Sequence, residues 1–211
     1  MPTPHPEPST LVFLVKPGNP ESMWFRASKT PQNSVKLRLM EHPASQDEYL
    51  DLVDENDQVI GKKKRSEVYA EGLSNFRVVN AFIVNSKGEI WIPRRAASKR
   101  GFPLCLDMSM GGHVESAETY EATLKRETQE ELNLDTDKIQ IRLLGHLSPQ
   151  QDGVSCNMNV YEIKMDTVPD YNQDDFVEYF WLTPQALLEK LATGDKCKDD
   201  LPRLVKIFYG E

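Results

Sequence analysis

The sequence predicts an α/β fold in which a central mixed sheet is covered by helices on both faces. Two observations lead to this prediction. Short segments with strand composition recur over residues 48–182, and a few helix-forming segments lie between them. The longest of these, residues 116–132, has no Gly or Pro and consists mostly of good helix formers. A chain of 211 residues that is 39% hydrophobic can bury one good core and a small appendage.

Residues 1–46 are predicted to form an extension that precedes a main domain over residues 47–211. The extension holds eight of the fourteen prolines, and the alternating prolines of residues 2–8 favour an extended tail. Residues 11–15, 23–26 and 35–40 have the composition of short strands, which would form a small added sheet.

Two hairpins are predicted at the start of the main domain, over residues 48–61 and 77–93, with turns at 54–57 and 85–88. The other expected strands are residues 106–110, 139–147, 154–164 and 178–182. Thr183 and Pro184 are typical of a helix start and predict a helix over residues 185–191, closed by Gly194. Pro202 opens a last helix that ends at Tyr209.

The helix predicted over residues 116–132 carries three acidic side chains on one face. Glu127, Glu130 and Glu131 are related as i, i+3 and i+4, so they fall within an arc of roughly 100°. Like charges at this spacing repel, and a divalent cation with a preference for oxygen ligands, Mg²⁺ or Mn²⁺, would compensate. The alternative is a solvated acidic surface. A neighbouring stripe, which would pack the helix on the sheet, contains Ala117, Leu124, Thr128 and Leu132.

Two glycines precede this helix. The backbone at Gly111 and Gly112 has no side chain, so it can turn sharply, approach a phosphate or present a carbonyl to a metal ion. An ordinary turn is the alternative. At the other end Asn133 is expected to form a left-handed cap.

Residues 112–134 contain a six-residue pattern, G-x5-E-x7-R-E-x-x-E-E, formed by Gly112, Glu118, Arg126, Glu127, Glu130 and Glu131. The pattern resembles the Nudix box, the signature of hydrolases that cut a diphosphate linked to another group. This chain departs mildly from the family pattern, with Asn133 in place of Gly and Thr128 in place of an aliphatic residue. The resemblance implies a Nudix-type α/β/α sandwich.

The resemblance also implies roles for the residues of the box. Glu127, Glu130 and Glu131, with Gly111, would hold one or more Mg²⁺ ions on the diphosphate while water attacks one phosphorus. Arg126 would orient the carboxylates through ion pairs. Gly112 and Glu118 would be structural, the latter at the helix start. The general base stays open between these three glutamates and one beyond the box.

The predicted substrate contacts lie before the box. Arg94, Arg95, Lys99 and Arg100 form a basic cluster that either meets phosphates or is solvated. The remaining candidates each have a structural alternative in the core, in a turn or on the surface: Trp91, Phe102, Phe180 and Trp181 for base stacking, His113 for a phosphate, Lys62 to Arg65 for guiding an anion, and Glu178 for a metal.

Residues 48–209 are most similar to the Nudix branch that includes isopentenyl diphosphate isomerases and their hydrolase relatives. Such isomerases need a Cys acid/base, His metal ligands and glutamates, but the matching positions hold Gly111, Phe76 and residues 156–158, which read Cys-Asn-Met. The intact R-E-x-x-E-E favours hydrolysis of a nucleoside diphosphate-like molecule. Isopentenyl diphosphate isomerisation and a catalytically silent nucleotide-binding module are the alternatives.

Composition limits the other classes of partner. A net charge of −8 argues against general nucleic-acid or anionic-membrane binding, and no apolar run reaches the length of a bilayer span. The N-terminus lacks the regions of a signal peptide, so we expect a cytoplasmic protein that acts on a small molecule. A homodimer is compatible with the sequence. Cys105, Cys156 and Cys197 lack disulfide or zinc spacing and are expected to be reduced packing residues.

Overall fold

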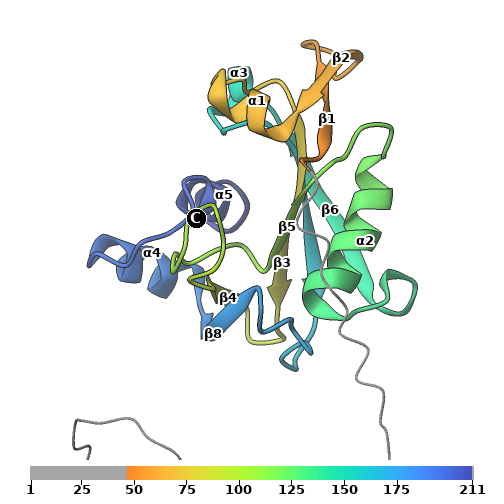
Figure 1. Cartoon of the computed structure of the whole chain (residues 1–211). Coiled ribbons are helices and arrows are strands. Elements are labelled where there is room, and N and C mark those ends of the chain that lie inside the picture. The colour runs from red at the N-terminus through yellow and green to blue at the C-terminus, as the bar shows by residue number, and fades with distance from the viewer. Residues whose placement is uncertain (1–46, 211) are drawn as a thin grey trace, which may run out of the picture. The chain divides into compact units, whose positions relative to one another are not determined.

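The structure is a computed structural model that describes residues 47–210. The three short strands expected within residues 1–46 lie outside the described residues. Figure 1 shows the arrangement of the elements. The elements are β1 (Tyr49–Val53), β2 (Val59–Lys64), α1 (Arg65–Ala70), β3 (Arg77–Val84), β4 (Ile90–Arg95), β5 (Met110–His113), α2 (Tyr120–Leu132), the 3-10 turn η1 (Thr136–Lys138), β6 (Gln140–Leu147), α3 (Pro149–Asp152), β7 (Asn157–Lys164), β8 (Phe176–Leu182), α4 (Pro184–Ala192) and α5 (Leu201–Tyr209).

Six of these strands form one mixed sheet. Its order is β6-β7-β3-β4-β8, and β5 pairs with β3 on the same edge as β4. β3 and β7 run parallel, whereas the other pairs are antiparallel. β1 and β2 form a separate antiparallel pair. The mixed sheet and both predicted hairpins are therefore confirmed.

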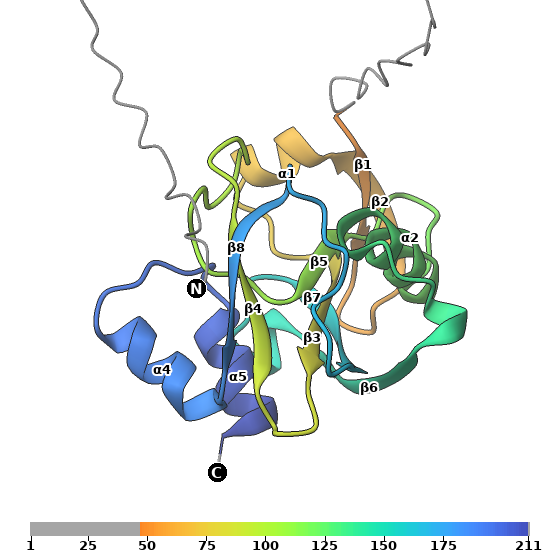
Figure 2. The same cartoon turned by 90° about the horizontal axis from the view of Figure 1, so that it is seen from below.

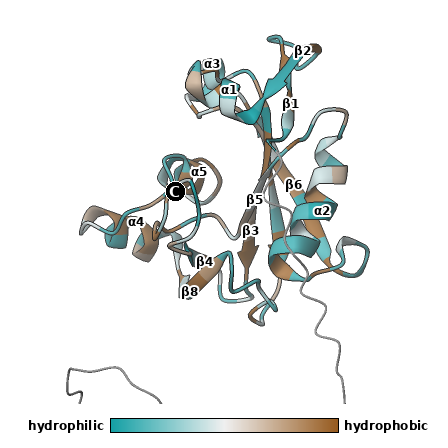
Figure 3. Cartoon of the chain, in the orientation of Figure 1, coloured by the Kyte–Doolittle hydropathy of each residue, from teal (hydrophilic) through white to brown (hydrophobic). Residues whose placement is uncertain are grey.

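Helices cover both faces of the sheet, with α2 on one side and α4 and α5 on the other (Figure 2). Val79 and Ile83 of β3 lie in the core under α2. The alternate residues Phe82 and Val84 lie in the core under α4 and α5. In Figure 3 the ribbons of β3, β4 and β8 are largely brown, whereas β2 and much of α2 are teal. This layering confirms the α/β/α sandwich.

The sheet divides at β3, and the division leaves one edge of β5 free. Residues 78–81 of β3 pair with β5, and residues 83–84 pair with β4. The buried Ser109 joins the two parts, because its Oγ donates to Trp91 O at 2.6 Å and accepts from Ile83 N at 2.8 Å. Among the described strands, β5 pairs with β3 alone. Its second edge is open to side chains.

The helix of the box begins later than the sequence predicts. α2 starts at Tyr120, and its N-cap is Thr119, whose side chain accepts from Ala122 N at 3.2 Å. The preceding turn is held by Asp51, which accepts from Ser116 Oγ at 2.7 Å and from Ala117 N at 3.0 Å. Ala117 is exposed in a left-handed conformation, so its place in the packing stripe is wrong.

The rest of that stripe is confirmed, since Leu124, Thr128 and Leu132 are buried. Asn133 forms the expected left-handed cap, at φ 52°. Glu118 lies in the turn just before the helix, because the backbone becomes helical only after Thr119.

One predicted strand lies elsewhere in the sequence, and two short helices were not predicted. The strand predicted over residues 106–110 is shifted to Met110–His113, since Leu106 makes only isolated bridges to Arg94 and Cys197. The charge run of residues 62–65, which ends β2 and begins α1, is exposed or half-buried, as its surface alternative predicts. The helices α1 and α3 span six and four residues, too short for an apolar period to reveal them. All three cysteines are free, and two are buried, as expected.

Candidate active site

The polar face of α2 lies against the free edge of β5. The backbone N–H of Gly111 donates to Glu131 Oε2 at 3.2 Å, and Arg126 Nη2 donates to the carbonyl of His113 at 3.1 Å. In an antiparallel strand, the N–H and C=O of one residue point to the same edge. The carbonyl of Gly111 therefore points to the edge that Glu131 occupies.

The two glycines do not form the turn that was the alternative explanation for them. Both lie in β5, and neither has a positive φ. A Cβ built on Gly112 would lie 2.0 Å from Glu127 Cδ. Only glycine leaves room for the carboxylate of Glu127 beside this strand. The structural role of Gly112 stays a prediction, and the group that this glycine accommodates is a side chain of α2.

Arg126 organises the acidic face. It forms two charge-assisted hydrogen bonds with Glu118, at 3.0 and 2.9 Å, and one of 2.7 Å with Glu127 Oε1. A longer contact of 3.5 Å reaches Glu130. The guanidinium holds the pKa of Glu118 down, at about 2. The predicted ion pairs are present, and Glu118 supports Arg126 from the turn before the helix.

The three glutamates of α2 differ in their surroundings. Burial raises the pKa of Glu127 to about 7, although Arg126 opposes the rise. Burial and repulsion from Glu127 raise the pKa of Glu131 to about 8. The side chain of Glu130 is 59% exposed, whereas that of Glu127 is 13% exposed. Two carboxylates are thus largely removed from water side by side, which is unfavourable unless a cation neutralises them.

The donor set suits a hard divalent cation. Mg²⁺ is usually held by one or two carboxylates, waters and substrate phosphates, and carboxylate and carbonyl oxygens are its preferred ligands. Glu127, Glu131 and the carbonyl of Gly111 provide such oxygens at one strand edge. Across residues 47–210, no three His, Cys, Asp or Glu side chains converge on one point, and Arg126 engages both Glu127 and Glu130. These residues therefore fit a divalent cation that would also be coordinated by phosphate oxygens of a substrate.

The predicted basic cluster is divided between two places. Arg94 pairs with Glu178 and with Asp195, and also donates to the carbonyl of Leu104 at 3.1 Å. Arg94, which was expected to contact the substrate, and Glu178, which was considered as a metal ligand, are therefore paired with each other. Arg100 is exposed, and no ion pair with it occurs within the described part of the chain.

Arg95 and Lys99 lie nearer the glutamates. Arg95 Nη1 is 2.6 Å from Asp107 Oδ2, and Lys99 forms an ion pair with Asp175. Both carboxylates contribute to the raised pKa of Glu131, which indicates that they are close to it. The sequence did not single out Asp107 or Asp175, because neither belongs to a spaced motif.

His113 forms an aromatic cluster on the other side of β5. It stacks on Phe76 with 5.8 Å between ring centroids, and its Nε2 is 2.9 Å from Tyr69 Oη. Burial lowers the pKa of His113 well below 6.5, and nearby cations lower it further, so the ring is neutral. Trp91 is fully buried, as the core alternative for this residue predicts.

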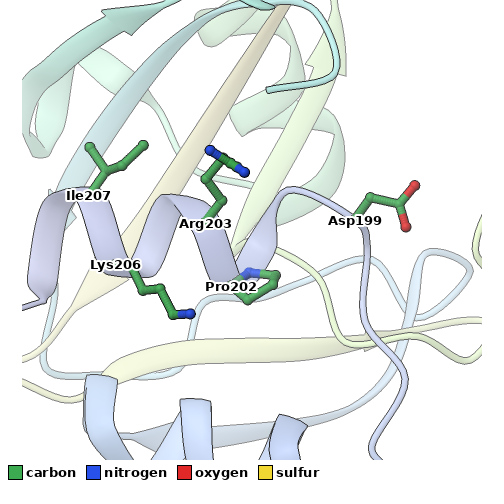
Figure 4. Close-up of a pocket in the computed structure, with 5 residues that line it drawn as sticks. All are labelled: Asp199, Pro202, Arg203, Lys206 and Ile207. Atoms are coloured by element: carbon green, nitrogen blue, oxygen red, sulfur yellow. The ribbon is translucent and has the colours of Figure 1, made fainter. Parts of the chain in front are cut away.

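Two surface pockets have linings that do not include the three glutamates. One, of about 470 Å³, is lined by Asp199, Pro202, Arg203, Lys206 and Ile207 at α5 (Figure 4). The other, of about 420 Å³, lies beside α2 and the 3-10 turn and includes Arg126. Neither is lined by Glu127, Glu130 or Glu131. The site at β5 is therefore identified by its chemistry and not by these cavities.

Comparison with known proteins agrees with the geometry. The family model of the NUDIX domain matches residues 74–201. The chain belongs to the Nudix hydrolase family. It is 62% identical over 162 residues to an uncharacterised Nudix hydrolase of Nostoc sp., covering 77% of this chain and 96% of the relative. The Nudix assignment identifies it as a hydrolase of phosphorus-containing anhydrides, in a family that generally uses divalent metal ions.

A solved structure supports the Nudix fold. A crystal structure of a Deinococcus radiodurans protein superposes with a TM-score of 0.73 at 46% identity, covering 77% of this chain and 99% of that chain. A more distant relative is an isopentenyl-diphosphate Delta-isomerase of Kocuria rhizophila, 27% identical over 147 residues, covering 68% of this chain and 82% of the relative. The similarity to the isomerase branch is confirmed.

Two of the positions that matter to an isomerase, Phe76 and residues 156–158, lie beside each other at the aromatic cluster. Phe76 stacks on His113, and its carbonyl accepts from Asn157 N at 3.0 Å. Burial raises the pKa of the adjacent Cys156 thiol to about 12, so this thiol stays protonated.

None of the described helices is long and apolar enough to cross a membrane.

Proposed function

We propose that the protein hydrolyses the diphosphate linkage of a nucleoside diphosphate-like small molecule with Mg²⁺ as its cofactor. The observation that carries this proposal is the pair of largely buried carboxylates, Glu127 and Glu131, held beside the backbone of Gly111 and Gly112. When bound there, Mg²⁺ would neutralise charge that develops on the diphosphate. Mn²⁺ has the same ligand preferences and would substitute.

Each residue of the face has a role in the proposal. Glu127 and Glu131 would hold the cation with the carbonyl of Gly111, and the exposed Glu130 would be available as a further ligand. Arg126 keeps Glu127 turned toward β5 through its 2.7 Å contact. One of the three glutamates, or a glutamate beyond the box, would accept the proton of the attacking water. The chemistry therefore depends on α2 and β5 together.

The test is an activity panel with purified protein. Nucleoside diphosphate sugars, dinucleotides, nucleoside triphosphates, coenzyme A esters and isopentenyl diphosphate are each incubated with Mg²⁺ and with EDTA. We expect Mg²⁺-dependent release of phosphate monoesters from at least one nucleotide. Conversion of isopentenyl diphosphate to its allylic isomer would contradict the proposal, and so would the absence of turnover across the panel.

A matched pair of variants tests whether the activity depends on the acidic face of α2. Glu131→Gln removes a buried carboxylate, whereas Glu121→Gln changes an exposed residue in the first turn of the same helix. We expect the first variant to lose activity and the second to keep it. Equal activity of both variants would contradict the role of the carboxylate pair.

A further inference from the structure

The loop between α4 and α5 is fixed against the segment that leads into β5. Leu106 N donates to the carbonyl of Lys196 at 2.8 Å, and Lys198 N donates to the carbonyl of Leu106 at 2.9 Å. Leu106 is fully buried, so these two bonds anchor the loop to the core. The side chain of Lys198 therefore leaves a fixed backbone position.

The side chain of Lys198 reaches the backbone that holds Glu131. Its Nζ lies 3.6 Å from the position that a Cβ on Gly111 would take. Gly111 is also the residue whose backbone N–H donates to Glu131. α5 and the loop before it lie on the side of β5 opposite to α2 (Figure 1). A cation and an acidic face thus approach one strand from its two sides.

Lys198 lacks a close carboxylate partner beside Gly111. Asp107 is the only carboxylate in the described part of the chain that forms an ion pair with it, at a long 3.7 Å. Asp107 already accepts from Arg95 at 2.6 Å, and Lys99 has its own partner in Asp175. Of these three cations, Lys198 is therefore the one without a close carboxylate partner of its own.

The ammonium of Lys198 can bind a further anion. Its side chain is 28% exposed, and its one carboxylate partner among the described residues lies 3.7 Å away. An anion placed beside Gly111 would give the ammonium a closer partner. A phosphate is such an anion, and an ammonium binds it as a compact point charge.

We propose that Lys198 binds the diphosphate of the substrate from the α5 side while the glutamates of α2 hold its Mg²⁺ from the other. This rests on the proposed function and names the anion contact that it requires. Lys198 thereby takes the role that the sequence assigned to Arg94 and Arg100. Arg95 and Lys99 support it by occupying Asp107 and Asp175, which leaves the ammonium free for the substrate.

Binding of a non-hydrolysable diphosphate tests Lys198 apart from catalysis. Methylenediphosphonate is titrated by calorimetry into the full chain with Mg²⁺, for wild type, Lys198→Met, Lys198→Arg and Lys196→Met. We expect Lys198→Met to weaken binding about tenfold or more, because one charge-assisted contact is lost. Lys198→Arg keeps the charge and is expected to stay within about threefold of wild type. Lys196→Met changes a lysine of the same loop and is the matched control.

Two further measurements separate the outcomes. Mn²⁺ binding without phosphate, followed by electron paramagnetic resonance, is expected to be unchanged in Lys198→Met and weakened in Glu131→Gln. The melting temperature shows whether each variant is folded. Unchanged diphosphonate binding in folded Lys198→Met would overturn the role of Lys198, even if the enzyme hydrolyses nucleotides. Absence of diphosphonate binding by wild type would overturn it as well. Binding without turnover of any substrate would contradict the proposed function and leave the role of Lys198 intact.

Discussion

The two sides of β5 are built in different ways. On the α2 side, the groups that meet its free edge belong to residues 111–131, and each contact is made between neighbours along this short stretch. On the α5 side, the charged groups come from three distant segments and meet only through tertiary pairing. The first side is a local motif, and the second depends on the whole sheet.

The difference explains how each side tolerates substitution. On the α2 side carboxylates, a guanidinium and a glycine are in mutual contact, so one change disturbs several partners. On the α5 side Arg95 and Asp107 contact each other directly, so we expect their pair to persist without Lys198. We therefore expect large, coupled effects on the first side and separable effects on the second.

The largest effect is expected when a buried carboxylate of α2 is neutralised. Glu131→Gln should lower kcat by at least about 100-fold, since it removes a metal ligand and its charge. The fold should not lose stability, because an amide replaces a carboxylate whose pKa burial raises to about 8. Steady-state kinetics and thermal unfolding in EDTA check the two parts. A fully active double variant, carrying both Glu130→Gln and Glu131→Gln, would contradict the large effects expected on the α2 side.

The predictability of the two sides differs for the same reason. The spacing of Glu127, Glu130 and Glu131 is enough to place them on one helical face, because helix geometry is local. The N-terminal boundary of α2 was missed, since it depends on Asp51, 65 residues before Ser116. Lys198 was missed because no spacing connects residues that meet only when a sheet forms. The ion pairs of Arg94 were equally hidden, since its partners lie in β8 and in the loop after α4.

A smaller effect is expected from filling the space at Gly112. Gly112→Ala places a methyl group 2.0 Å from Glu127 Cδ and must displace that carboxylate. We expect kcat to fall by about 10- to 100-fold, because misplacing one ligand weakens transition-state stabilisation. Gly61→Ala is the control, since nothing lies within 4 Å of its added Cβ. Equal kinetics for the two variants would show that the close approach at Gly112 is dispensable.

Replacing the guanidinium tests whether Arg126 acts as an organiser. Lys has one compact charge and cannot bind Glu118 and Glu127 at once with directed N–H groups. Arg126→Lys should lower kcat by about tenfold, with a smaller change in Mn²⁺ affinity, because the carboxylates remain but are less well ordered. Kinetics and metal titration measure the two quantities. A loss of Mn²⁺ binding as large as that of Glu131→Gln would assign Arg126 a larger part in the metal site.

The smallest expected effect concerns acid stability at the edge of the α2 side. Contact with Arg126 lowers the pKa of Glu118 from 4.5 to about 2, so its ion pair stabilises the folded state above about pH 4.5 and is lost as the pH falls toward 2. The side chain is partly exposed, so solvent screening limits the contribution to about 1 kcal/mol. The unfolding free energies of wild type and Glu118→Gln, measured in urea, should therefore differ at pH 6, and the difference should shrink as the pH falls from about 4.5 toward 2. A difference that stays constant over this range would mean that Glu118 stabilises the turn through its hydrogen bonds to Thr123 and Glu115 N, and not through its charge.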